Sequence, residues 1–150
     1  MKHLENNLEH MNTLLLFSLE VEQIYFKVLA TVKDDNLEVI LKDAITSKRK
    51  FNTALKAEIV KFGGTPASYR KQNIKLNATH FRFKRALNNI EDSSYVIIEL
   101  CKIKELNIKA CNALLQERHL PLSVCKLLIA QKDDIQAFIG VIKTRGELVA

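Results

Sequence analysis

Residues 36–66, NLEVILKDAITSKRKFNTALKAEIVKFGGTP, decide the fold class of this chain. The apolar residues of this stretch recur every three or four positions, so they share one face of a helix, and lysines occupy the other face. They are Leu37, Ile40, Leu41, Ala44, Ile45, Phe51, Leu55, Ile59 and Phe62. Gly63 can adopt the left-handed conformation that closes a helix, and Pro66 cannot continue one. The stretch therefore predicts a long amphipathic helix that ends at Gly63.

A second long helix is expected before it, over about residues 4–33. Its apolar stripe has alternating steps of three and four, and it consists of Leu8, Met11, Leu15, Ser18, Glu22, Tyr25, Leu29 and Val32. This register places Glu22 on the inner face. The polar break at residues 34–36 contains good N-cap residues, and a connection this short makes the two helices antiparallel.

The last 60 residues predict another hairpin. A capping pattern at residues 91–94 starts a helix that runs to about residue 118, and Pro121 suits the first turn of the next one, which ends near Gly146. In the first of these helices Glu105 shares the inner face with the apolar residues. These are expected to be Tyr95, Ile98, Cys101, Ile108, Cys111 and Leu115. The second is expected to turn inward Val124, Leu128, Gln131, Ile135, Phe138 and Ile142.

The segment between the hairpins is basic and long enough to travel the length of the bundle. Residues 59–90 contain no acidic residue but seven cations, more than the whole net charge of +6. We expect this segment to be a crossover with an extra helix. Four helices in two antiparallel hairpins joined by a long crossover form the ferritin-like four-helix bundle, which is the predicted all-α fold; a helical array is disfavoured because no fixed-period repeat is present.

Composition fits a single domain over residues 1–150. Apolar residues make up 47% of the chain, and Gly and Pro together number six, which is typical of a mainly helical protein. The three cysteines show no C-x-x-C spacing, so we expect plain core residues rather than disulfide or zinc ligands. The chain start lacks the features of a signal peptide and no apolar run reaches membrane-span length, so a cytoplasmic protein is expected.

Ferritin-like bundles bind two metal ions through a lone Glu on two helices and Glu-x-x-His on the other two. Glu22 and Glu105 stand where the lone glutamates are expected. Both Glu-x-x-His positions differ, because the level tetrads read Ser47-Lys-Arg-Lys50 and Gln131-Lys-Asp-Asp134. We expect Lys50 to neutralise Glu22, since a buried unpaired carboxylate is costly. No metal or other cofactor is expected; if a metal binds, its ligands are Glu22, Glu105 and Asp134. The main prediction is a polar layer of Glu22, Ser47, Lys50, Glu105, Gln131 and Asp134.

The hairpin that ends in Phe-Gly-Gly-Thr-Pro at residues 62–66, the basic crossover and the second hairpin at residue 91 together resemble an uncharacterised bacterial family of ferritin-like four-helix proteins, distant kin of rubrerythrin and bacterioferritin. The likeness covers about residues 12–146. It implies a bundle, frequent self-association and no settled activity. The departures at Ser47, Lys50 and Gln131 argue against oxidase, peroxidase or iron-storage activity.

No catalytic triad, Cys/His pair or phosphate-binding Gly-rich loop is present, so an enzyme is disfavoured. The crossover, residues 61–85, offers a patch for an anionic partner, a nucleic acid or a membrane surface, through Arg70, Lys71, Lys75, Arg82, Lys84 and Arg85. The alternative is that these cations form a solvated outer face. The wide apolar face of residues 14–28 suggests burial under the crossover or a homodimer. The function favoured by the sequence is a non-enzymatic, self-associating structural or stress-type interaction protein; the alternatives are a degenerate carboxylate metal site and the anionic partner.

Overall fold

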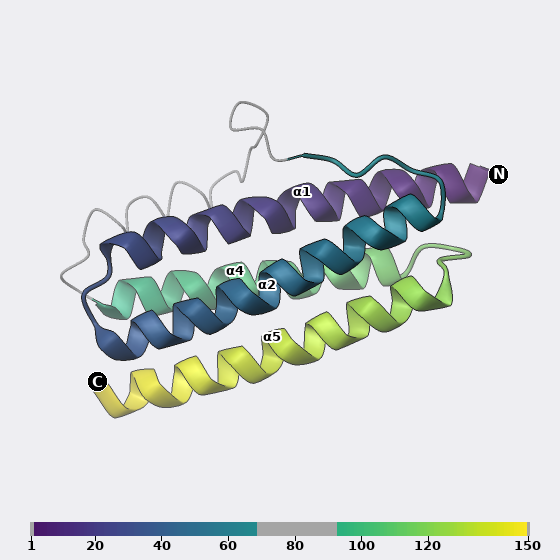
Figure 1. The fold of residues 1–150 in the computed structure, drawn as a ribbon. Helices are drawn as coiled ribbons and strands as arrows, with labels where there is room; N and C mark the ends of the chain where they lie inside the picture. The colour runs from purple at the N-terminus through teal and green to yellow at the C-terminus, as the bar shows by residue number, and fades with distance from the viewer. Residues whose placement is uncertain (1, 69–92, 150) are drawn as a thin grey trace.

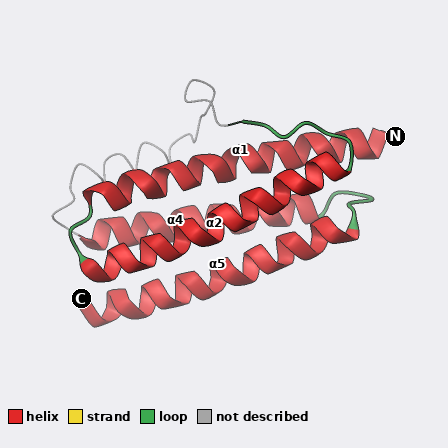
Figure 2. Ribbon diagram, in the orientation of Figure 1, coloured by secondary structure: helices red, strands yellow, loops and turns green. Residues whose placement is uncertain are grey.

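The computed structural model describes residues 2–68 and 93–149, and these ranges form four α-helices and no strand (Figures 1 and 2). The helices are α1 (Lys2–Thr31), α2 (Asp35–Lys61), α4 (Ser93–Leu115) and α5 (Leu122–Val149). The predicted all-helical class and the four long helices are thereby confirmed. The crossover helix lies outside the described residues.

Each helix packs against two neighbours. α1 contacts α2 and α4, and α5 contacts α2 and α4. Figure 1 shows that each of these neighbouring pairs runs antiparallel, whereas α2 and α4 run in the same direction. Side-chain bonds fix one end of the bundle: Asn7 Nδ2 donates to Arg118 O at 3.1 Å, and Ser123 Oγ donates to Glu58 Oε2 at 2.8 Å. The end of α2 and the start of α4 therefore lie at opposite ends of the bundle (Figure 1).

Both ends of α2 are capped as its sequence predicts. Asp34 Oδ1 accepts hydrogen bonds from Asn36 N at 2.9 Å and Leu37 N at 3.2 Å, which satisfies two otherwise unpaired N–H groups of the first turn. At the other end Gly63 has φ 90°, its N donates to Val60 O at 3.0 Å, and Gly64 N donates to Ile59 O at 2.9 Å. This pair of bonds is a Schellman motif, so the predicted glycine stop is confirmed.

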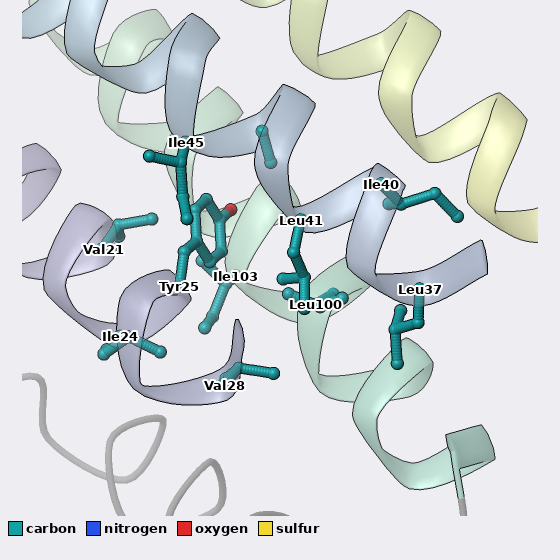
Figure 3. Packing of buried hydrophobic residues seen from close by; sticks show 11 residues of the cluster. Val21, Ile24, Tyr25, Val28, Leu37, Ile40, Leu41, Ile45, Leu100 and Ile103 are labelled. Atoms are coloured by element: carbon teal, nitrogen blue, oxygen red, sulfur yellow. The ribbon is translucent and has the colours of Figure 1, made fainter. Parts of the chain in front are cut away.

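The core consists of two apolar clusters, one after the other along the bundle axis. One joins the C-terminal half of α1, the N-terminal half of α2 and the start of α4; Figure 3 shows Tyr25 of α1 among Leu41 and Ile45 of α2 and Ile103 of α4. The other joins the first half of α1, the second half of α2, the end of α4 and the start of α5. Three of the helices, α1, α2 and α4, thus contribute buried residues to both clusters, and Phe138 of α5 packs against the first.

The predicted inner face of α4 is confirmed at Cys111 and is wrong at Ile98 and Glu105. Ile98, expected inside, is 50% exposed, and Glu105 is exposed as well, whereas Leu100, Ile103 and Leu114 are buried. The helix is apolar around much of its circumference, so hydrophobicity does not single out one stripe. The predicted face of α5 is confirmed at Val124, Leu128, Gln131 and Ile135, all of which are buried.

Two smaller expectations concern the cysteines and the membrane. Cys111 is buried, Cys101 and Cys125 are partly buried, and all three are free thiols. No helix in residues 2–68 and 93–149 is long and apolar enough to cross a bilayer.

Candidate functional site

A layer of buried polar side chains separates the two apolar clusters. It draws on all four helices and comprises Ser18, Lys48, Asn52, Lys104, Asn107 and Gln131. Buried lysines are rare because burial strips the ammonium group of its water. Two of them in one layer make this the most unusual part of the described core.

Lys48 of α2 is 1% exposed and has one hydrogen bond, from Nζ to Asn107 Oδ1 at 3.1 Å. Its Nζ also lies 5.3 Å from the ring centroid of Phe51. Burial lowers the pKa of Lys48 to about 8, against a smaller opposing effect of the negative charge on Glu22. Lys48 therefore still carries most of its positive charge at neutral pH.

Lys104 of α4 is 2% exposed and lies between two aromatic rings. Its Nζ is 5.0 Å from the ring centroid of Tyr25 on α1 and 4.3 Å from that of Phe138 on α5. Burial lowers the pKa of Lys104 well below its ordinary value, the charge of Lys48 lowers it further, and Asp134 opposes both. The contacts shown for this Nζ among the described residues are those with the two rings, and it is not one of the fully enclosed polar atoms that lack a hydrogen-bond partner.

Glu22 is bonded to the part of this layer that lies between α1 and α2. Asn52 Nδ2 donates to Glu22 Oε1 at 3.1 Å, and Arg49 Nε lies 3.9 Å from Glu22 Oε2. Ser18 Oγ in turn donates to Asn52 Oδ1. Arg49 is therefore the ion-pair partner of Glu22 and Asn52 its hydrogen-bond donor, whereas the expected partner Lys50 is exposed.

Two enclosed polar atoms, one in the layer and one in the adjoining apolar cluster, lack a hydrogen-bond partner among the described residues. They are the Tyr25 hydroxyl and Asn107 Nδ2, both fully enclosed. An unpaired buried polar atom costs on the order of 1–3 kcal/mol. The layer is therefore only partly satisfied by its own side chains.

A groove of about 600 Å³ between α2 and α5 leads to this layer. Its polar lining consists of Asp43, Thr46, Ser47, Lys50, Lys104, Gln131 and Asp134. The rest of the lining is apolar and includes Phe51, Leu127 and Phe138. Lys104 thus lies between two aromatic rings and is also a part of the groove wall.

The six residues predicted to share a polar layer are divided among three places. Ser47, Lys50, Gln131 and Asp134 line the groove together. Glu22 lies in the network of α1 and α2, and Glu105 is exposed on α4. The three carboxylates suggested as metal ligands are therefore not brought together, and the described part of the chain contains no group of three or more His, Cys, Asp or Glu side chains placed to hold a metal ion.

Sequence reasoning missed the two lysines and Asn107. A signal for Lys48 was present, because the apolar stripe of α2 skips one whole turn between Ile45 and Phe51, and Lys48 fills that gap. The six residues of the proposed anionic-partner patch, at positions 70–85, lie outside the described residues.

A family model described as a domain of unknown function (DUF2383) matches residues 6–117. This chain belongs to that family. The match covers nearly all of α1 together with α2 and α4, and α5 follows it in the sequence. No curated protein and no solved structure matches the DUF2383 chain. The expected membership of an uncharacterised family is confirmed.

Proposed function

We propose that this DUF2383 chain is a ferritin-like four-helix bundle that works without a di-metal centre, as a non-enzymatic, self-associating interaction protein. The observation that carries the proposal is the position of Lys48 and Lys104 in the buried middle of the bundle. Ferritin-like metalloproteins fill that level with carboxylates and imidazoles from four helices. Metal ligands must be deprotonated, and a protonated ammonium group repels a cation in a low-dielectric interior.

The helix directions support the ferritin-like part of this proposal. α2 and α4 run in the same direction, and each neighbouring pair is antiparallel (Figure 1). A bundle with this pattern needs one long connection between its hairpins, as ferritin-like folds have.

The self-association part is supported by exposed apolar side chains on α5. Leu122 is 68% exposed and Ile129 is 50% exposed. The two residues are seven apart, so they lie on the same side of the helix. Large apolar side chains that gather on one face commonly mark a protein–protein contact.

Metal analysis tests the first part. We expect protein purified without chelators to contain far less than one transition ion per chain, and added Fe²⁺, Mn²⁺ or Zn²⁺ to leave its melting temperature unchanged, because ligand binding to the native state alone would raise it. Glu22→Gln provides the matched control, since it removes a carboxylate that the proposal gives no metal role. About two ions per chain, lost in Glu22→Gln, would overturn this part of the proposal.

Light scattering coupled to gel filtration tests the second part. We expect a mass of twice 17.1 kDa, falling to 17.1 kDa in the variant Leu122→Lys/Ile129→Lys. A wild-type protein that stays at 17.1 kDa over a concentration series would refute self-association.

A further inference from the structure

The groove between α2 and α5 combines two features that a ligand site needs. Its volume of about 600 Å³ is in the range of small-molecule sites, and most of its wall is apolar. One buried cation, Lys104 Nζ, forms part of that wall.

Lys104 is the independent sign of a missing ligand. An ammonium group can donate three hydrogen bonds, and the close contacts shown for this one in the described part of the chain are with the rings of Tyr25 and Phe138. Its length would allow the side chain to reach solvent along the groove, as lysines on apolar surfaces usually do, but it is 2% exposed. The arrangement leaves a place for an acceptor from outside the chain.

We propose that this groove binds an amphipathic monocarboxylate of the fatty-acid type, with its carboxylate at Lys104 Nζ. The carboxylate would give Lys104 a charge-assisted hydrogen bond, which is among the strongest available to it. The alkyl chain would lie along Leu127, Phe138 and Phe51, which supply the apolar wall.

The charges of the groove select a singly charged ligand. Lys50 and Lys104 are its cations, and Asp43 and Asp134 are its anions. A phosphate or nucleotide carries about two negative charges and would meet both aspartates, so like-charge repulsion disfavours it. The proposal goes beyond the function proposed above and does not depend on it, because a metal-free monomer would present the same groove.

Binding is expected to take up a proton. The groups that face Lys104 are Tyr25 from α1, Lys48 from α2 and Asp134 from α5, and the first of these is neutral at physiological pH. A bound carboxylate favours the charged form of Lys104 and so raises its pKa. The affinity for a carboxylate should therefore fall as rising pH removes the proton from Lys104, whereas the affinity for a neutral alcohol should not change.

The experiment is calorimetric titration of the full chain with decanoate and with decanol, each below its aggregation concentration. We expect decanoate to bind at about one per chain and more tightly than decanol. Lys104→Met keeps the length of the side chain and removes its charge, so it should weaken decanoate binding by about tenfold or more, as for a hydrogen bond to a charged group, and leave decanol unchanged. Lys109→Met, at an exposed position of the same helix, is the matched control and should bind both ligands as the wild type does.

A second variant tests the groove without touching the lysine. Ala130 lines the groove and is exposed, so Ala130→Trp leaves the core intact and fills part of the space; because the chain has no other Trp, its fluorescence reports whether the ligand arrives there. We expect lost or weakened decanoate binding in this variant. The proposal is refuted if decanoate does not bind at millimolar concentration, if decanol binds equally well, or if Lys104→Met or Ala130→Trp binds decanoate like the wild type.

Discussion

Replacing Lys48 by Met should change how the stability of the protein depends on pH. The ordinary pKa of a lysine, 10.5, applies to the unfolded chain, and burial lowers the value in the folded chain to about 8. Below pH 8 both states hold the proton, and the folded state bears the full cost of the buried charge. Between pH 8 and 10.5 the unfolded state binds more protons, so the free energy of unfolding of the wild type rises with pH in this window.

The size of the effect follows from the two pKa values. Their difference corresponds to about 3 kcal/mol at about 1.4 kcal/mol per pKa unit, and most of it is recovered between pH 7 and pH 10. Lys48→Met loses this titration but also removes the hydrogen bond to Asn107, which costs on the order of 1–3 kcal/mol at every pH. The diagnostic quantity is therefore the free energy of unfolding of the wild type minus that of Lys48→Met. This difference should increase by about 2–3 kcal/mol from pH 7 to pH 10, because only the wild type gains stability over this range.

Urea unfolding followed by circular dichroism at pH 7, 8, 9 and 10 measures this difference. Lys56→Met is the matched control, because Lys56 lies on the same helix with its side chain in solvent. The control should follow the wild-type pH dependence. If Lys48→Met and the wild type instead give parallel curves from pH 7 to pH 10, Lys48 is not a buried cation and the polar layer is wrongly described.

Three further predictions use the same unfolding assay. Asp34→Ala should lower the free energy of unfolding by about 1 kcal/mol, because the first turn of α2 loses its cap. Asp35→Ala, one position later, should have a smaller effect. Equal losses of stability in the two variants would contradict the capping role of Asp34. Gly64→Ala should lower the free energy of unfolding by about 1–3 kcal/mol, because an added Cβ would lie 2.9 Å from a leucine methyl of α1 and 3.0 Å from an isoleucine methyl of α2. An unchanged urea midpoint would show that both side chains move aside at little cost. In a double-mutant cycle at pH 7, Lys48→Met and Lys104→Met should be coupled, since each removes the same repulsion; strict additivity would show that the two charges do not interact.

The sequence predicted the helices well because their signals are local. The apolar period, the cap at Asp34 and the glycine pair at the end of α2 each act within a few residues, so they can be interpreted without the partner helices. The inner face of α4 is a tertiary property. Ile98 and Leu100 are equally apolar, and only the positions of α1 and α5 decide that Leu100 is buried.

The site was predicted only in part for a related reason. Counting equal distances from the turns placed Ser47 level with Glu22 and Gln131 level with Glu105; in the structure Ser47, Lys50, Gln131 and Asp134 line the groove, and Glu22 and Glu105 do not. Lys48 fills a gap in the apolar stripe of α2, but lysine is so rarely buried that this position alone did not lead to the prediction of a core residue. Its burial follows from the fit of four helices and from the acceptor that Asn107 supplies across the bundle.

The two apolar clusters stabilise the halves of the bundle, whereas the polar layer between them destabilises its middle. Clusters of fully buried side chains lie on either side, with Leu41 and Leu100 in one and Leu55 and Leu128 in the other. Each such side chain contributes about 1.5–3 kcal/mol by its burial, which offsets a middle layer that is destabilising by itself. A sequence under selection for stability alone would replace Lys104 by an apolar residue of similar size, because that is often neutral or favourable for a buried charge. The proposed carboxylate ligand would account for a lysine that is nearly buried in the wall of a groove and does not contribute to stability.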